Sequence, residues 1–320
     1  MIRLILSLAL FLPSAISLAA DVKYYDLPEG ARPHDVAPAA EAGGPVWYTA
    51  QRQGALGRLD PATGKVEQIP LGKGSAPHGV IIGPDGAPWV TDGGLNAIVR
   101  VDPSTHEVKR YLLPIDDYAN LNTATCDKAG HRWFTGQSGY YGRLDPASGK
   151  IQVWPSPRGR GPYGITTTPA GVVYYASLAG NHIARIDRAT GKATAIDPPT
   201  AGQGARRVWS DSAGRIWVSE WMSGQVSVYN PAAADAGKSW QAWKLPGDKP
   251  KPYSIWVDEH DKVWLSDFAA NAILRFDPDT ETFKSFPSNA RNAAVRQMLG
   301  RKGEAWGAES GTDRLVVVKY

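Results

Sequence analysis

Two histidines in matching contexts are the side chains of this sequence best suited to chemistry. His34 stands in RPHDV (32–36) and His78 in APHGV (76–80). The proline before each histidine stiffens the backbone and fixes where the imidazole begins. A neutral histidine beside a carboxylate acts as a general base near neutral pH. We therefore predict acid–base chemistry at His34 and His78, with His78 as the base and Asp92 as its carboxylate.

Side chains of other kinds take the place of these histidines at the same position later in the chain. They are Asn122, Tyr163, Arg206 and Tyr253. In each case a turn follows, and the residue beyond it is expected to face the first across a hairpin. The expected pairs are His78 with Asp92, Asn122 with Gly136, Tyr163 with Ser177, Arg206 with Glu220, Tyr253 with Asp267, and Val295 with Glu309.

This pairing would collect two histidines, one arginine and four carboxylates in a funnel at one end of a central channel. Such a set suits a divalent cation or acid–base catalysis. The alternative is a wet channel whose polar residues are only solvated. In that case Arg206 and Glu220 would form an ion pair that holds one hairpin.

A repeat of about forty residues positions these side chains. An aromatic landmark recurs at spacings of 41 to 47 residues, at Trp47, Trp89, Trp133, Tyr174, Trp217, Trp264 and Trp306. Such a period is typical of propeller blades. Residues 78–114 contain four short apolar or alternating runs separated by turn residues, which leaves no room for a helix of normal length. We predict an all-β fold, a seven-bladed β-propeller of four-stranded antiparallel blades.

The two ends of the repeated region predict how the ring closes. VKYYDLP (22–28) aligns without a gap with VKRYLLP (108–114), which is the fourth strand of its repeat. The last repeat stops after its third strand. The N-terminal strand is therefore expected to complete the last blade and to pair an edge that would otherwise be open. This closure predicts a single domain over residues 21–320.

Composition and charge argue against several classes of protein. The formal net charge is +4 and the basic residues are scattered, so nucleic acid is not an expected partner. The single cysteine excludes an internal disulfide framework. Residues 1–20 have one arginine before a short apolar core, the pattern of a signal peptide, and no later stretch is long enough to span a membrane. We expect an exported protein, periplasmic or secreted, without stable membrane insertion, and a monomer, which a closed ring permits.

The repeat also resembles a known family. Its pattern, P-[HY]-G-[IV] followed by D-x-G-x-[IV]-W-[FV]-[TS]-[DE] and N-x-I-x-R-[LIV]-D, is similar to that of the streptogramin B lyases over nearly all of residues 21–320. PYGIT (162–166) and WFT (133–135) look especially like their blades. The resemblance implies a seven-bladed propeller that opens a cyclic depsipeptide by elimination at its ester, aided by Mg²⁺, and so confers antibiotic resistance.

The resemblance also implies site residues. His34 and His78 match the family's two histidines, and Asp92 stands at the spacing of a family glutamate. Ala76 stands where the lyases have a second glutamate. We therefore expect Asp92 and Glu309 as metal ligands, and His34, His78 and Asp92 as catalytic residues. The expected ligand is a small molecule or cyclic peptide, bound by the remaining funnel residues Asn122, Tyr163, Arg206 and Tyr253.

Two other functions stay open at this point. One is a non-catalytic exported propeller that binds a peptide, a sugar or a protein partner in the funnel, which Ala76 favours. The other is a calcium-dependent lactonase that uses the carboxylates Asp92, Glu220, Asp267 and Glu309. The mass of the product separates the lyase from the lactonase, because elimination leaves the mass unchanged and hydrolysis adds one water.

Overall fold

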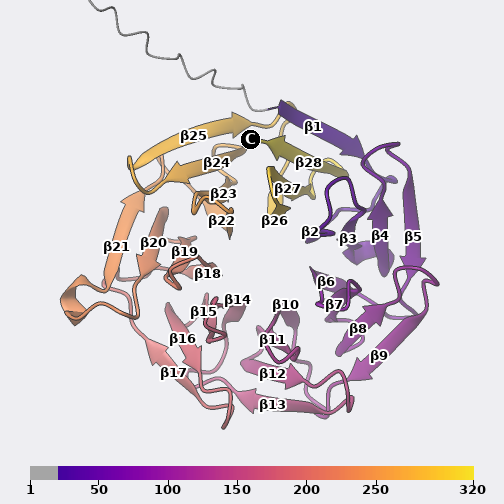
Figure 1. Ribbon diagram of the computed structural model, residues 1–320, viewed down its shortest axis with the longest axis horizontal. Helices are drawn as coiled ribbons and strands as arrows, with labels where there is room; N and C mark the ends of the chain where they lie inside the picture. Colours follow the sequence, from indigo (N-terminus) through magenta and orange to yellow (C-terminus); the bar gives the residue numbers. More distant parts are fainter. Residues whose placement is uncertain (1–20) are drawn as a thin grey trace, which may run out of the picture.

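Seven four-stranded antiparallel sheets surround a central axis in the computed structural model, which describes residues 21–320 (Figure 1). The predicted signal peptide, residues 1–20, lies outside the described residues. In each sheet the first strand lies nearest the axis and the fourth lies at the rim (Figure 1). The predicted all-β fold, a seven-bladed propeller of four-stranded blades, is confirmed.

The strands of the first four blades follow one another along the chain. Blade 1 contains β2 (Val36–Pro38), β3 (Val46–Ala50), β4 (Ala55–Leu59) and β5 (Val66–Pro70), with the short 3₁₀ helix η1 (Gln51–Gln53) after β3. Blade 2 contains β6 (Pro77–Ile82), β7 (Pro88–Asp92), β8 (Ala97–Val101) and β9 (Val108–Leu112). Blade 3 contains β10 (Leu121–Cys126), β11 (Arg132–Gly136), β12 (Tyr140–Leu144) and β13 (Ile151–Pro155). Blade 4 contains β14 (Pro162–Thr167), β15 (Val173–Ser177), β16 (His182–Ile186) and β17 (Ala193–Ile196).

The last three blades continue the series and close the ring. Blade 5 contains β18 (Ala205–Ser210), β19 (Ile216–Glu220), β20 (Gln225–Tyr229) and β21 (Trp240–Lys244), with η2 (Ala236–Lys238) before β21. Blade 6 contains β22 (Pro252–Val257), β23 (Val263–Asp267), β24 (Ala272–Asp277) and β25 (Thr282–Pro287). Blade 7 contains β26 (Val295–Arg301), β27 (Glu304–Glu309), β28 (Arg314–Lys319) and the N-terminal β1 (Asp21–Asp26).

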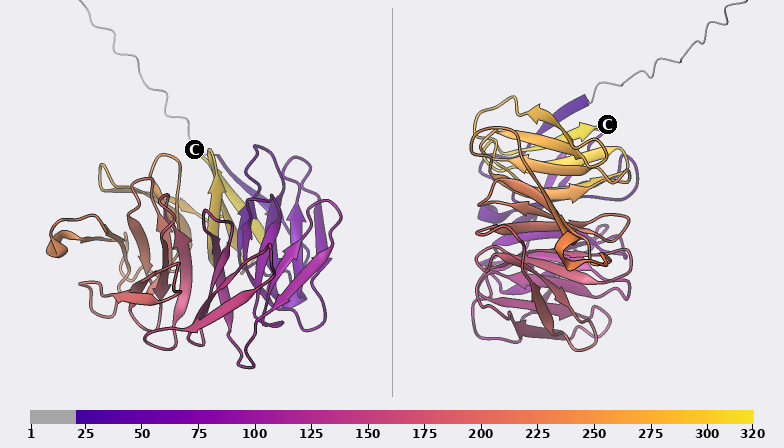
Figure 2. Two further views of the ribbon diagram at one scale, coloured as in Figure 1. Left: turned by 60° about the horizontal axis from the view of Figure 1, so that its bottom comes forward. Right: turned by 90° about the vertical axis from the view of Figure 1, so that its left-hand side faces the viewer.

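The closing strand pairs as predicted. β1 runs antiparallel to β28, with Val22 opposite Val318 and Tyr25 opposite Leu315. The side views show the two ends of the described chain meeting at this blade (Figure 2). The pairing covers the edge of β28 with backbone hydrogen bonds, which removes an open edge from the ring.

The apolar core lies between neighbouring blades. The tryptophans of the second strands, such as Trp89 and Trp133, are at most 2% exposed. One cluster joins Trp89 and Ile98 of blade 2 to Phe134 of blade 3. The indole N–H of Trp89 donates to Asp85 at 3.0 Å, and the same type of bond to a turn carboxylate recurs at other blades. Burial of these large rings between blades, with their N–H groups satisfied, makes the ring a rigid support for the channel.

The register of the inner hairpins differs from the predicted one. The first strands of blades 2 to 7 each have a β-bulge. In blade 2 this bulge makes Pro77, not His78, the partner of Asp92. The same correction applies to Asn122, Tyr163, Arg206 and Tyr253, whose preceding residues pair with Gly136, Ser177, Glu220 and Asp267; only Val295 pairs with Glu309 as predicted. Counting from the turn assumes a constant register, and one extra residue re-aims the side chains on either side of it.

No helix within residues 21–320 is long and apolar enough to cross a membrane.

Candidate functional site

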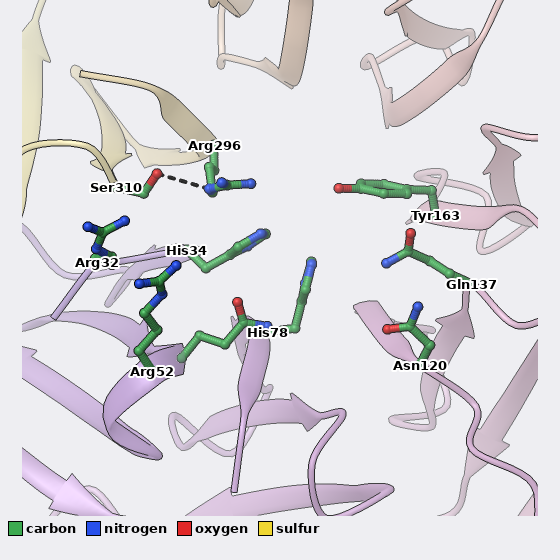
Figure 3. A pocket seen from close by; sticks show the side chains of 10 residues that line it. Arg32, His34, Arg52, His78, Asn120, Gln137, Tyr163, Arg296 and Ser310 are labelled. Carbon is green, nitrogen blue, oxygen red and sulfur yellow. Dashed lines mark hydrogen bonds between the residues drawn. The ribbon is translucent and has the colours of Figure 1, made fainter. Parts of the chain in front are cut away.

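A cavity of about 340 Å³ opens at the end of the channel where the inner strands begin. We call this cavity the funnel. Figure 3 shows the side chains that line it, which come from several blades. They are Arg32, Arg52, Arg296, His34, His78, Tyr163, Asn120, Gln137, Gln51 and Ser310. Cationic and neutral hydrogen-bonding groups thus line the funnel, and no carboxylate of residues 21–320 is among them.

His34 is held by the residue that follows it. Its Nδ1 lies 2.8 Å from Oδ1 of Asp35, and both side chains are buried. Because a carboxylate only accepts, Nδ1 donates and the lone pair of the neutral ring is on Nε2. None of the described residues forms a hydrogen bond to that Nε2. Burial holds the pKa of His34 well below its usual value, and the guanidinium charges of Arg207 and Arg296 act in the same direction. At neutral pH His34 is therefore a neutral imidazole with a free basic nitrogen.

The carboxylate of Asp35 also forms a buried ion pair across the channel. Arg207 of β18 reaches Oδ1 through Nη2 at 3.1 Å and Oδ2 through Nη1 at 3.4 Å. Arg207 also donates to Oγ1 of Thr123 at 2.6 Å. Burial raises the pKa of Asp35, while the charge of Arg207 opposes that shift. Arg207 therefore fixes the position of Asp35, and through it the ring of His34.

His78 on β6 is held by the neighbouring blade. Its Nδ1 donates to the carbonyl oxygen of Asn122 at 3.1 Å, and its Nε2 accepts from the Asn122 amide nitrogen at 3.2 Å. The rings of His34 and His78 have centroids 3.8 Å apart. Burial lowers the pKa of His78 well below its usual value, and repulsion between the two rings when both are protonated acts in the same direction. Two neutral imidazoles thus lie in contact at the base of the funnel.

A pair of tyrosines lies beside the histidines. The hydroxyl oxygens of Tyr163 and Tyr253 are 2.8 Å apart. Arg206 donates to the Tyr163 hydroxyl at 2.9 Å and lies over the Tyr253 ring at 3.7 Å. Burial raises the pKa of Tyr163. It would also raise that of Tyr253, but the charges of Arg206, Arg207 and Arg296 outweigh it and lower the pKa. The pair offers polarised hydroxyl groups near the histidines, since the ring centroids of Tyr163 and His78 are 6.3 Å apart.

The structure brings together all six side chains that the repeat position predicted for the funnel. These are His34, His78, Asn122, Tyr163, Arg206 and Tyr253, which are linked by the contacts described above. Of these six, His34, His78 and Tyr163 line the funnel, whereas Arg206 and the buried Asn122 and Tyr253 do not. The roles predicted for them in catalysis and substrate binding stay predictions.

The predicted carboxylates Asp92 and Glu309 lie elsewhere. Asp92 accepts from the backbone N–H of Ala76 at 2.9 Å and of Leu95 at 3.0 Å. Glu309 pairs with Arg314 at 2.7 Å. Glu220 and Asp267 likewise bond to residues near their own strands. These carboxylates fasten loops at the end of the second strand. In blades 2, 5 and 6 the residues His78, Arg206 and Tyr253 lie at the bulge, one position after the partner of the carboxylate, so they do not face it across the hairpin.

Sequence reasoning missed the residues directly behind the ring. Asp35 and Arg207 follow His34 and Arg206, at a position where two other blades have Gly79 and Gly164. A Cβ on Gly164 would lie 2.6 Å from Cα of Arg207, so glycine there allows close approach of the next strand. Two charged residues at a position that is glycine, threonine, serine or glutamine in the other blades were the available signal.

Arg296 stands in blade 7 where His78 stands in blade 2, because Val295 pairs with Glu309 as Pro77 pairs with Asp92; counting had chosen Val295 for that position. Arg32 and Arg52 follow no repeat pattern and had no such signal.

The residues present do not fit the magnesium ion that the resemblance implies. Within residues 21–320, His34, Asp35 and His78 form the one group of three side chains whose ligand atoms lie within 4.8 Å of one another. Mg²⁺ prefers oxygen ligands and binds imidazole poorly. The only carboxylate in the group is already engaged by Arg207, and further guanidinium groups surround it. We therefore derive no step through a metal ion.

The chain is similar to several known proteins. Residues 14–237 match the sequence model described as the virginiamycin B lyase family. No curated protein matches the chain. The solved structure of virginiamycin B lyase from Staphylococcus aureus is 20% identical, with a TM-score of 0.85 over 94% of this chain and 100% of that chain.

Two further structures show how widely the fold is used. A catalytically inactive virginiamycin B lyase from Staphylococcus aureus, solved with quinupristin, has the same TM-score of 0.85 and identity of 20%, over 94% of this chain and 100% of that chain. YCF48 bound to a D1 peptide is 12% identical, with a TM-score of 0.71 over 93% of this chain and 96% of that chain. At such identities the likeness shows the fold alone, because one fold supports many functions.

Proposed function

This chain belongs to the virginiamycin B lyase family, and on that premise we propose that the funnel is the active site of a lyase that opens an ester by elimination. The proposed substrate is a cyclic depsipeptide of the streptogramin B type. The observation that carries the proposal is the 2.8 Å bond between His34 and Asp35. It leaves a basic nitrogen unengaged inside a cavity large enough for part of a peptide.

His34 acts as the general base in this proposal. Its Nε2 takes the proton from a carbon next to a carbonyl group. The electron pair left on that carbon forms a double bond to the next carbon, and the bond from there to the ester oxygen breaks. The carboxylate leaves, the ring opens, and no water is consumed. Asp35 holds the imidazole in the required tautomer and stabilises its protonated form.

Negative charge develops on the carbonyl oxygen as the proton leaves, and cationic side chains stabilise it. Arg296 lines the funnel and donates to the hydroxyl of Tyr253 at 3.4 Å, and Arg206 contacts both tyrosines. Preorganised donors in a site with little water are the usual means of stabilising such an oxyanion. In this chain the guanidinium groups supply the positive charge that a metal ion would supply elsewhere.

We assign the base to His34 rather than His78, because Asn122 already bonds to Nε2 of His78. His78 then supports the His34 ring, and Tyr163 contacts the substrate. Asn122 holds His78, and Arg206 and Tyr253 hold the hydroxyl of Tyr163. Asp92 and Glu309 have no part in the proposed step. We also propose, from residues 1–20, that the protein is exported, so that any antibiotic would be opened outside the cytoplasm.

Mass spectrometry of quinupristin incubated with the purified protein tests the proposal. We expect a linear product of unchanged mass, and no product with His34→Gln. His260→Gln is the matched control, because His260 is an exposed histidine in a turn. A product heavier by one water would show that the reaction is hydrolysis and not elimination. A depsipeptide that stays intact under all conditions would show that it is not a substrate of this protein.

A propeller that binds its ligand without reaction is the second candidate. The observation that favours it is Ala76, which leaves the approach to His78 without a second carboxylate. Saturable binding of quinupristin to the wild-type protein with no change in the ligand would support this function over the lyase.

A further inference from the structure

The positive charge of the funnel is not balanced by carboxylates. Arg32, Arg52 and Arg296 line the cavity, and Figure 3 shows them around His34. The chain as a whole has a formal net charge of only +4. The three positive charges around this one cavity are therefore comparable in number to the net charge of the whole chain. A concave site lined by one sign of charge concentrates ligands of the opposite sign.

These arginines also lack the ion pairs that arginines form elsewhere in the protein. Arg100 pairs with Asp85 at 2.8 Å, and Arg158 pairs with Asp197 at 2.5 Å. Within residues 21–320, no carboxylate oxygen lies within 4.0 Å of the guanidinium groups of the three funnel arginines. The Asp313 carboxylate beside Arg32 accepts from the backbone N–H of that residue at 2.6 Å. The charges of the three arginines remain available to a ligand.

One of the three is held in a defined place. Arg296 on β26 donates through Nε to the hydroxyl of Ser310 at 2.9 Å and through Nη1 to that of Tyr253 at 3.4 Å. The hydroxyl of Ser310 carries no charge, so it orients the guanidinium without neutralising it. A guanidinium with planar donors suits a carboxylate or phosphate group, which it can bind through two hydrogen bonds.

Arg207 differs from the three funnel arginines. Asp35 neutralises it at the base of the channel, and Arg207 is 1% exposed. The carboxylate of Asp35 is therefore paired with the buried Arg207, and the cavity above it keeps a net positive charge. The amide side chains of Asn120 and Gln137 add neutral hydrogen-bond donors to the wall.

We infer that the funnel binds an oxyanion group of its ligand, a carboxylate or a phosphate, through Arg32, Arg52 and Arg296. The ligand class is thus one that carries an acidic group, in addition to any ester that is opened. That this anion belongs to the molecule undergoing elimination rests on the proposed function, whereas the binding of the anion does not. If the substrate of the elimination carries a carboxylate next to the carbon that loses its proton, the guanidinium groups would neutralise that carboxylate and so ease removal of the proton.

Isothermal titration calorimetry with unreactive probes tests the inference. The probes are N-acetylthreonine, its neutral N-methylamide, and inorganic phosphate, each at low and at high NaCl concentration. We expect the acid or phosphate to bind, the amide not to bind, and salt to weaken binding because the contact is ionic. Tighter binding of N-acetylthreonine identifies the group as a carboxylate, and tighter binding of phosphate identifies it as a phosphate.

Single-charge variants locate the site. Arg52→Gln and Arg296→Gln should each weaken binding of the anion at least about tenfold, the usual scale for loss of one charged hydrogen bond. Lys302→Gln is the matched control, because it removes one positive charge from the exposed turn at the opposite end of the β26–β27 hairpin. Absence of binding by both anions, or equal binding by all variants, would overturn the inference.

His34→Gln separates this inference from the proposed function. It removes the base but leaves all three arginines, so it should keep anion binding while losing any elimination. A wild-type protein that binds the anion and never eliminates would disprove the lyase function alone. A protein that eliminates quinupristin but binds neither anion would disprove the anion site alone.

Discussion

Asp35 bonds to His34 and to Arg207 at the same time, although its two partners come from blades on opposite sides of the channel. The distances are 2.8 Å to Nδ1 of His34 and 3.1 Å to Nη2 of Arg207. One carboxylate therefore orients the proposed base and neutralises a buried cation. The side chain of Arg207, from β18, reaches across the channel to Asp35 in the segment before β2. The geometry of His34 therefore depends on two distant parts of the ring.

Asp35→Asn tests whether that carboxylate serves the base. The amide keeps the shape of the side chain but cannot accept a proton or stabilise an imidazolium, so the wrong tautomer of His34 becomes accessible. By analogy with other carboxylate–histidine pairs, we expect kcat to fall by about 10³-fold or more, with a smaller change in KM. Steady-state kinetics on quinupristin measures both constants. Asp102→Asn, at an exposed turn, is the control and should keep wild-type activity. Unchanged kcat in Asp35→Asn would show that His34 does not depend on this carboxylate.

The lowered pKa values of His34 and His78 predict how stability depends on pH. A buried neutral histidine binds fewer protons in the folded state than in the unfolded state below the unfolded pKa of about 6.5. The contribution of each neutral histidine to the free energy of unfolding is therefore fully present above that pH. It falls as the pH drops below that value, by up to about 1.4 kcal/mol per pH unit for each histidine.

Urea unfolding between pH 5 and 7.5 measures this slope. His78→Asn should reduce it, and His260→Gln should not, because His260 is exposed. Asp35 contributes in the opposite sense, since its raised pKa makes the folded state bind more protons at acidic pH. The comparison between variants removes that contribution. A wild-type slope equal to that of His78→Asn would contradict the lowered pKa of His78.

In blades 1 to 6, the side chains that meet at this end of the channel could be placed from the sequence because a repeat fixes position by counting. In blade 7 counting chose Val295, and the structure has Arg296 at that position. Tyr163 and Tyr253 stand in the same place of their repeats as His78, and a ring brings equivalent positions to one axis. Ring closure could be predicted for the same reason, since residues 22–28 match a fourth strand. Periodicity is a strong signal when each blade packs only on its neighbours.

The carboxylates could not be placed, because counting fails at a bulge. Asp92 was expected opposite His78, but one extra residue in β6 gives it Pro77 as partner and directs its oxygens to the Ser75–Ala76 loop. The ion pair of Asp35 with Arg207 joins residues 172 positions apart, and no local pattern links them. Contacts across the channel depend on how seven blades meet, which the sequence of one blade does not contain.

Removal of metal should leave the reaction unchanged. The group of His34, Asp35 and His78 is rich in nitrogen, and its carboxylate is engaged by Arg207, so it does not suit Mg²⁺. We expect the same rate of quinupristin opening in EDTA and in added MgCl₂. Initial rates measured by chromatography give the comparison, with protein analysed for bound metal beforehand. A rate that EDTA abolishes and Mg²⁺ restores would require ligands other than those described.

The ion pair between Asp35 and Arg207 predicts a characteristic pattern of stabilities. Removal of one member leaves the other charge buried without a partner, so Asp35→Asn or Arg207→Gln alone should destabilise by about 3–5 kcal/mol. The double variant buries no unpaired charge from this pair and should lose less than the sum of the single losses. Urea unfolding at pH 7.5 of the four proteins gives the coupling free energy, expected to be about 1–3 kcal/mol. Strictly additive losses would show that the two groups do not stabilise each other, and that Arg207 does not hold Asp35 beside His34.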